Sequence, residues 1–319
     1  MGATIAGLKV FDAAAVAETL TIEAAIPVVR EAMIALSAGR VRQELRSFIG
    51  LGPGRTFAIM PAALDNAAVF GAKLVSVFAD GEGRKAHEGL VILFEGEGGA
   101  PVCLADAGEV TSIRTAAASA AATATLARPD ATRLAVLGTG RQARAHIEAV
   151  AKVRPIRSVT IWGRDFDRAV AFAAATSLDL DIPCVARVDA RRVVEDADII
   201  CTTTTAADPV LLGDWVAPGA HVNLVGSSGP AQAEADGVLV AKSRFIVDHR
   251  QHVLVHGGEF LRAKAAGLVD DSAVAAEIGE VFAATAPGRT RDDEITVYKS
   301  LGHAVQDLAC VAWLKGRAA

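Results

Sequence analysis

Cysteine is scarce in this chain of 319 residues, and its distribution argues against two kinds of site. The four cysteines lie far apart and form no CxxC pair, so neither a disulfide framework nor a thiolate metal site is indicated. They are Cys103, Cys184, Cys201 and Cys310. His249, His252 and His256 have a spacing that suits one helix face, but no cysteine or carboxylate cluster accompanies them. We therefore predict that the protein holds no metal.

Long apolar runs and an excess of positive charge are also missing. No apolar stretch reaches membrane-spanning length, and the N-terminus lacks the charged start and long apolar run of a signal peptide. The formal net charge is −5, and no basic run offers a surface to nucleic acid. With 52% hydrophobic and 22% charged residues, the composition is that of a globular protein. We predict a cytoplasmic protein that acts on a small molecule.

What the sequence does contain is a strand, a glycine turn and a helix in succession. The apolar run Leu134 to Leu137 is followed by a turn and then by residues with helical spacing. This is the G-x-G-x-x-A form of a dinucleotide fingerprint, which needs only a small residue at its third position. An ordinary strand-to-helix turn is the alternative, but a second β-rich run at 158–162 supplies the expected context. The predicted cofactor-binding residues here are Gly138, Thr139, Gly140, Arg141, Gln142 and Ala143.

The loop after the second β-rich run bears on which dinucleotide is bound. An acidic residue at this place takes the ribose hydroxyls of NAD, whereas an arginine suits the 2′-phosphate of NADP. The first loop position is Arg164, and Arg168 follows one helical turn later. Asp165 argues the other way, because it could serve the hydroxyls of NAD. We predict that NADP(H) is favoured over NAD(H).

The pattern of apolar residues differs between the two halves of the chain. Short β-like runs separated by Gly, Asp and Glu predict a largely antiparallel sheet at 57–60, 69–78, 90–94 and 102–105. A helix of small residues at 111–128 then joins the halves. Beyond it, strands alternate with helices, which predicts an α/β, doubly wound parallel sheet. Its strands are expected at 134–137, 158–162, near 184, and at 198–203, 221–225 and 244–248, with helices at 142–152 and 166–176. A last helical segment at 295–314 is expected to return to the first half.

Three cations in or near the first half lie where the local sequence gives no reason for a charge. Lys73 interrupts an apolar strand, Arg114 lies near the start of the small-residue helix, and Arg46 precedes a glycine loop. A lysine desolvated in this way has a lowered pKa and can act as an acid or base. Each cation alone could be a structural ion-pair partner, but together they suggest a site for a carboxylate. His87 is a further candidate for substrate contact, and a loop histidine satisfied by backbone is the alternative.

These motifs together resemble the ornithine cyclodeaminase/mu-crystallin family. The resemblance rests on five segments of the chain, from Arg46 to Asp307. They are GAKLVSVF around Lys73, SIRTAAASA around Arg114, VLGTGRQARAH at the glycine turn, VNLVGSS at 222–228 and ITVYKSLGHAVQDLA at 295–309. It implies a Rossmann domain, 117–292, inserted into an α+β substrate-binding and dimerisation domain formed by 1–116 and 293–319. It also implies that Arg46, Lys73 and Arg114 hold the carboxylate of the substrate. The resemblance further implies that the protein is a homodimer.

The chain departs from part of this family at Ser228. Members that deaminate an amino acid place an aspartate there in a GxD context, whereas this chain reads Gly226-Ser227-Ser228. A serine cannot serve as the carboxylate base that such a reaction needs. Members with serine resemble the imine reductases, which reduce Δ1-pyrroline-2-carboxylate, and often Δ1-piperideine-2-carboxylate, with NAD(P)H. We count Ser227 with the cofactor-binding residues and Ser228 and Lys73 as catalytic.

We therefore predict an oxidoreductase that reduces a cyclic ketimine carboxylate to the cyclic amino acid. Two other functions remain open at this point. One is an NAD-dependent ornithine cyclodeaminase, which releases ammonia. The other is a non-catalytic protein of the mu-crystallin kind that binds NADPH and a small ligand. Neither the ring size of the imine nor the proton donor follows from the sequence.

Overall fold

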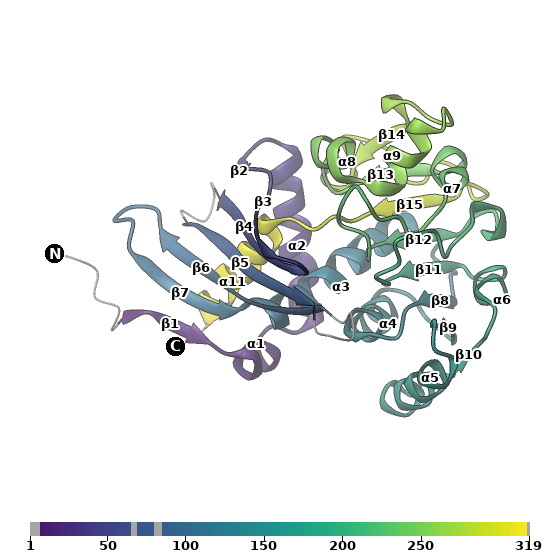
Figure 1. The fold of residues 1–319 in the computed structure, drawn as a ribbon, viewed down its shortest axis with the longest axis horizontal. Helices are drawn as coiled ribbons and strands as arrows, with labels where there is room; N and C mark the ends of the chain where they lie inside the picture. The colour runs from purple at the N-terminus through teal and green to yellow at the C-terminus, as the bar shows by residue number, and fades with distance from the viewer. Residues whose placement is uncertain (1–6, 65–68, 80–84, 318–319) are drawn as a thin grey trace. The chain divides into compact units, whose positions relative to one another are not determined.

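The computed structural model describes residues 7–64, 69–79 and 85–317, without the side chains of residues 79 and 85–87, and the chain divides into two compact units. One unit consists of residues 1–115 and 303–319, and the other of residues 116–302 (Figure 1). The segment 293–302 was expected in the first unit, but the structure places it in the second. The reason is that its strand is paired on both sides within the second unit's sheet.

A mixed sheet forms the centre of the first unit, in the order β1-β7-β6-β5-β4-β2, with β3 paired to β4. Its elements are β1 (Lys9–Phe11), α1 (Ala13–Thr19), α2 (Ile22–Ser37), β2 (Val41–Gln43), β3 (Ser47–Gly52), β4 (Arg55–Leu64), β5 (Val69–Ala79), β6 (Lys85–Glu95), β7 (Pro101–Asp106) and α11 (Ala304–Arg317). The strands β4 to β7 are antiparallel, as predicted, and only β1 runs parallel to its neighbour. The strands β1, β2 and β3 were not predicted.

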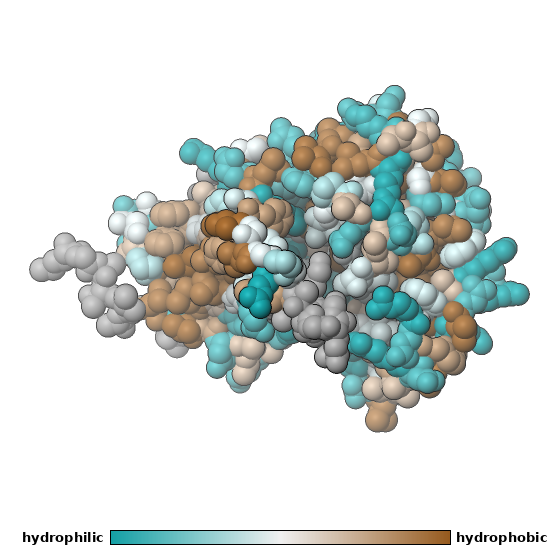
Figure 2. All heavy atoms as spheres, viewed as in Figure 1, coloured by the Kyte–Doolittle hydropathy of each residue, from teal (hydrophilic) through white to brown (hydrophobic). Residues whose placement is uncertain are grey.

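The two faces of this sheet differ in character. The helix α11 packs across β4 to β7 and against α2, and covers the face that carries Lys73, Val91 and Leu93. Alternate residues point the other way, and that face leaves large apolar side chains such as Phe70 and Leu90 exposed. Figure 2 shows apolar side chains at the surface of this unit, at the left of the view. A sheet face with several exposed large apolar side chains is unusual for a surface in contact with water alone.

The second unit is built on a parallel sheet in the order β10-β9-β8-β11-β12-β15-β13-β14. Its strands are β8 (Arg133–Leu137), β9 (Ser158–Trp162), β10 (Cys184–Ala186), β11 (Ile199–Thr202), β12 (His221–Leu224), β13 (Arg244–Val247), β14 (Val274–Glu277) and β15 (Thr296–Lys299). Its helices are α4 (Arg141–Val153), α5 (Phe166–Leu180), α6 (Ala190–Val194), α7 (Gly237–Lys242), α8 (Arg250–His256), α9 (Gly258–Ala265) and α10 (Ile278–Phe282), with 3-10 turns η2 (Gly213–Trp215) and η3 (Asp271–Ala273). The predicted doubly wound α/β fold is confirmed.

The central strands of this sheet are buried along their whole length, because helices cover both faces of a doubly wound sheet. This explains why β11 begins with a run of apolar residues rather than an alternation. The strand β15 belongs to the same buried set, and it corrects our expectation of a helix from residue 295. The helix begins only at Ala304. None of the described helices combines the length and the apolar character that crossing a bilayer requires.

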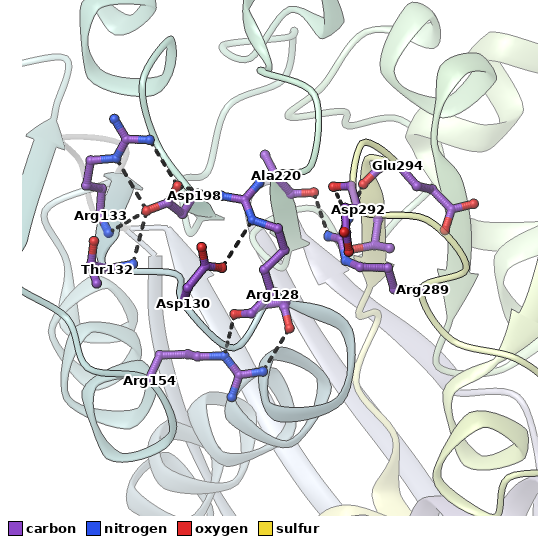
Figure 3. A network of polar contacts seen from close by, with 12 residues as sticks. Arg128, Asp130, Thr132, Arg133, Arg154, Asp198, Ala220, Arg289, Asp292 and Glu294 are labelled. Carbon is purple, nitrogen blue, oxygen red and sulfur yellow. Dashed lines mark hydrogen bonds and ion pairs between the residues drawn. The ribbon is translucent and has the colours of Figure 1, made fainter.

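The helix α3 (Ala107–Leu126) contributes residues to both units, and nearly all of its small side chains between 112 and 123 are buried. Its C-terminal carbonyl groups are capped by two arginines from the second unit. Arg154 donates to the carbonyl oxygens of Ala127 and Arg128 at 2.8 and 2.9 Å, and Figure 3 shows its guanidinium group beside Arg128. Arg289 donates to the carbonyl oxygen of Leu126 at 2.8 Å. Charged donors at this end satisfy carbonyl groups that have no partner within the helix.

Asp198 holds a second part of the same polar network. Its carboxylate accepts from Arg128 at 2.9 Å, from Arg133 at 3.0 Å and from the backbone of Thr132 at 3.0 Å (Figure 3). These contacts lie where β8 and β11 begin, at the opposite end of the strands from the glycine turn. Ligands of doubly wound folds bind at the other, C-terminal, end of the strands. We therefore regard this network as structural.

Candidate active site

The glycine turn between β8 and α4 has the geometry that a dinucleotide requires. Gly138 has a φ of 133°, which strongly favours glycine, and a side chain there would come within 2.5 Å of the Thr203 hydroxyl. The backbone N–H of Gly138 donates to the carbonyl of Trp162 at 2.8 Å, which ties the turn to the end of β9. The turn is thus closed against its neighbours on one side.

The other side of the turn is open. A Cβ atom added to Gly140 meets no described atom within 4 Å, and Gly140 is also the N-cap of α4. Backbone N–H groups at the start of a helix attract a pyrophosphate, and the lack of a Cβ lets that group come close. Ala143 is fully buried and packs helix against strand, as the third position requires. The residues present fit a dinucleotide, with Thr139, Arg141 and Gln142 in the same turn.

The loop after β9 contains the residues predicted to choose the cofactor. Arg164 and Arg168 are both exposed. The carboxylate of Asp165 is the N-cap of α5 and accepts from the backbone N–H of Arg168 at 3.0 Å. A Cβ on Gly163 would approach the Thr139 side chain to 2.7 Å, so this loop lies directly beside the glycine turn.

In the first unit, two of the three predicted cations share one carboxylate. The Lys73 ammonium lies 3.1 Å from Oδ1 of Asp307, and Nε of Arg114 donates to the same oxygen at 3.1 Å. Lys73 also donates to the Thr111 hydroxyl at 2.5 Å, and Arg114 to Oε1 of Gln306 at 2.7 Å. Lys73 and Arg114 are 5% exposed and Asp307 is fully buried. The helix α11 thus brings its carboxylate to the strand β5 and the helix α3.

The electrostatics of this cluster lower the pKa of its lysine. Burial, together with the like charges of Arg114 and Arg46, brings the pKa of Lys73 down to about 8, although Asp307 opposes the shift. Burial alone would raise the pKa of Asp307, but the charges of Arg114 and Lys73 outweigh it, and the pKa is lowered. Two cations therefore share one carboxylate with Arg46 near Lys73, and the cluster is short of negative charge.

Arg46 and His87 are the other two residues predicted to contact the substrate. Arg46 lies between β2 and β3, is partly buried, and is close enough to Lys73 to affect its pKa. His87 lies in β6 opposite Val77, but its side chain lies outside the described part of the chain. The role of His87 in substrate contact stays a prediction.

The two serines after β12 differ in their surroundings. Ser227 is buried, and its hydroxyl donates to the carbonyl of Gln232 at 2.8 Å. Its side chain is thus engaged within its own loop, and a cofactor contact by Ser227 stays a prediction. Ser228 is exposed at the end of the same loop. Both follow the C-terminal end of β12, where doubly wound folds bind their ligands.

Sequence reasoning missed Asp307 and Gln306 as site residues. They are separated from Arg114 by more than 190 positions, so no local spacing could connect them. The available signal was an acidic residue within the apolar face of α11, which predicts a buried ion pair.

The three histidines weighed as metal ligands lie at the start of α8 and within it. His249 is the N-cap of this helix, and the centres of the His249 and His252 rings are 5.0 Å apart. Within the described residues, no group of three or more His, Cys, Asp or Glu side chains is arranged to hold a metal ion.

Comparison with known proteins gives consistent matches over almost the whole chain. The sequence model of the ornithine cyclodeaminase/mu-crystallin family matches residues 8–319. The Δ1-pyrroline-2-carboxylate reductase of Bacillus cereus is 35% identical over 266 residues, covering 82% of each chain. The ketimine reductase mu-crystallin of Mus musculus is 34% identical over 288 residues, covering 88% of each. The structure of Thermococcus litoralis Δ1-pyrroline-2-carboxylate reductase with NADH and L-proline matches with a TM-score of 0.91 and 30% identity, covering 97% of this chain and 96% of that one.

Proposed function

Because this chain belongs to the ornithine cyclodeaminase/mu-crystallin family, we propose that it reduces a cyclic ketimine carboxylate to the cyclic amino acid with NAD(P)H. The proposed substrates are Δ1-pyrroline-2-carboxylate and the six-membered Δ1-piperideine-2-carboxylate. Relatives named as imine and ketimine reductases support the reaction class, which is NAD(P)H-dependent imine reduction. The observation that carries the substrate class is that Lys73 and Arg114 share a single carboxylate while Arg46 adds a third positive charge near Lys73.

The cationic cluster binds the acid group of the substrate in this proposal. Asp307 neutralises one charge and fixes the direction of the Lys73 and Arg114 side chains, which leaves positive charge for a second carboxylate. Arginine and lysine donors of this kind form charge-assisted hydrogen bonds with carboxylates. Holding the acid group fixes the position of the imine carbon beside it, and such orientation supplies a large part of the rate acceleration.

The reaction then needs a hydride at the imine carbon and a proton at the nitrogen. The chemistry that the nicotinamide supplies when bound is the hydride. Lys73, with its pKa near 8, is partly able to release a proton at neutral pH and is one proposed donor. Ser228 is proposed to hydrogen-bond to the ring nitrogen or to a water molecule beside it. A cyclic imine contains its C=N bond already, so no ammonia has to leave and no carboxylate base is needed at position 228.

We propose NADP(H) as the preferred cofactor. The carboxylate of Asp165 is occupied by the backbone of Arg168 as the cap of α5, and it is therefore less available to ribose hydroxyls. Arg164 and Arg168 are exposed in the loop that follows β9, where an arginine suits a 2′-phosphate. The similar Thermococcus litoralis protein is described with NADH, so binding of both forms has to be measured.

We also propose that the chain forms a homodimer through the open face of the first unit's sheet. This face exposes Ile49, Phe70 and Leu90. The rings of Phe70 and Phe94 stack at 5.3 Å, so on this face apolar side chains of β5 and β6 are in contact. Burying it against a second copy would remove that surface from water.

The proposed function is tested by cofactor oxidation with the five- and six-membered ketimines, run beside an ornithine assay for ammonia. We expect oxidation of NADPH with at least one imine, and no ammonia. Ammonia release without net formation of NADH would instead identify an ornithine cyclodeaminase. Tight NADPH binding without turnover of either imine would identify a non-catalytic binding protein.

A further inference from the structure

At the C-terminal end of the second unit's sheet, the carboxylate of Asp248 is completely buried and accepts from the backbone N–H groups of Leu301 and Gly302. Three further charged side chains described there are also completely buried, and they form a connected group. They are Glu234, in the segment after β12, Glu259, in the first turn of α9, and Lys299, the last residue of β15. The Lys299 ammonium lies 2.8 Å from Oε2 of Glu259 and donates to the carbonyl oxygen of Ser227 at 2.7 Å. Oε1 of Glu259 accepts from the backbone N–H of Glu234 at 3.0 Å. A group of buried charges this costly to desolvate calls for a physical reason.

Glu234 joins the ends of two neighbouring strands. One carboxylate oxygen accepts from the Thr202 hydroxyl and from the backbone N–H of Gly226, both at 2.6 Å. The other accepts from the backbone N–H and the hydroxyl of Thr204, at 2.6 and 2.8 Å. Thr202 ends β11, and Gly226 follows β12. A single side chain therefore fixes loop 202–204 to loop 226–228.

The donors around Glu234 favour its ionised form. Two of them are backbone N–H groups, which cannot accept a proton from a carboxylic acid. The Thr204 hydroxyl accepts from the N–H of Ala206 at 3.1 Å, which leaves its own proton for Glu234. Burial raises the pKa of Glu234 above its usual value, and the hydrogen bonds from Thr202 and Thr204 and the charge of Lys299 offset only part of that rise. The ionised form is assigned from the four donors that surround the carboxylate. Because Glu259 is paired with the Lys299 ammonium, an ionised Glu234 leaves one negative charge in this group.

The Glu234 carboxylate lies at the C-terminal ends of β11 and β12, close to the point where the strand order of the sheet reverses. The strand order reverses between β8 and β11, and doubly wound folds bind a dinucleotide beyond the C-terminal ends of the strands at such a point. Arg164 at the end of β9 marks the proposed adenosine side. A nicotinamide bound in this way would be held at the ends of β11 and β12, which are the ends that Glu234 joins.

We propose that Glu234, Glu259 and Lys299 form a positioning network that fixes the two loops beneath the nicotinamide and places one buried negative charge there. Hydride donation to an imine breaks the C4–H bond of the dihydronicotinamide and forms a C–H bond at the imine carbon. It leaves one positive charge on the nicotinamide ring, while the imine nitrogen takes up a proton. A buried negative charge nearby favours the oxidised ring over the reduced one and therefore favours hydride donation. This inference rests on the proposed cofactor site.

The test compares the binding of oxidised and reduced cofactor. Glu234→Gln keeps the shape of the side chain and removes its charge. The dissociation constants of NADP+ and NADPH are measured by titration, and those of NAD+ and NADH likewise. We expect the ratio of the oxidised to the reduced constant to rise about tenfold, the order of effect of one charge acting over roughly 10 Å of protein. Glu259→Gln removes the same amount of charge and gives the same readout if Glu234→Gln does not fold.

The matched control is the double variant Glu259→Gln/Lys299→Met, which removes one charge of each sign. Its ratio is expected to stay at the wild-type value, even where both affinities fall. A purely structural role would weaken both cofactor forms by the same factor in the single variants, and that result would overturn the proposal. If wild-type protein binds neither form, the proposed cofactor site is wrong, and this inference fails with it.

Discussion

The pKa of Lys73 predicts how substrate capture depends on pH. A pKa of about 8 makes the protonated fraction of Lys73 fall about tenfold between pH 7 and pH 9. If the ammonium binds the substrate carboxylate, kcat/KM should decline with it, because this parameter reports the free enzyme. The bound carboxylate favours the charged lysine, so the decline in kcat should come at higher pH. The measurement is steady-state cofactor oxidation with Δ1-pyrroline-2-carboxylate from pH 6 to pH 10.

The control separates Lys73 from the titration of the imine itself. In Lys73→Arg the side chain stays charged over this whole range, so its kcat/KM should show no decline centred near pH 8. Lys73→Met removes the charge and should lower kcat/KM at every pH. An alkaline decline that is the same in wild type and Lys73→Arg would show that another group is responsible, and our reasoning on this cluster would be wrong.

Three further predictions concern stability and cofactor choice. Asp307→Asn leaves two buried cations without their counter-ion and should lower the free energy of unfolding by about 3 kcal/mol in urea titrations; a loss below about 1 kcal/mol would contradict the ion-pair geometry. Arg164→Asp should weaken NADPH binding about tenfold and leave NADH binding little changed. The exposed Arg157, before β9, offers a control of equal charge, and equal effects of both substitutions would refute a local contact. Arg289→Met removes the donor to Leu126 at the end of α3 together with the donors to Glu294, Ala220 and Thr296, and should cost about 2 kcal/mol in the same unfolding assay. No measurable loss would show that solvent replaces these hydrogen bonds.

The elements around the nucleotide turn were well predicted from the sequence. The strand β9 was predicted at its observed bounds, and β8 and α4 within one residue at each end. Their signals are local: glycines in a tight turn, a strong helical period and short apolar runs. The strand β15 was missed because its four residues, Thr296–Lys299, lie just before a real helix and are buried on both faces. Burial on both faces removes the alternation that identifies a strand.

The candidate site was predicted in part. Lys73 and Arg114 were found because a charge in an apolar strand or a helix of small residues is conspicuous in the sequence. Asp307, which joins them, and the partners of Glu234 were not found, because these contacts connect distant parts of the chain. Hydrogen bonds between residues so far apart are decided by the topology of the sheets, which spacing along the sequence does not record.

The central claim is that hydride passes from a bound nicotinamide to the imine carbon of a cyclic ketimine carboxylate. The direct measurement uses NADPH and NADH deuterated at C4, on each face in turn, with Δ1-pyrroline-2-carboxylate, followed by mass analysis of the product. We predict one deuterium at C2 of proline for one face only, with one cofactor oxidised per product formed. Proline that carries no deuterium from either face, or no proline at all from this imine and no pipecolate from its six-membered analogue, would contradict the account.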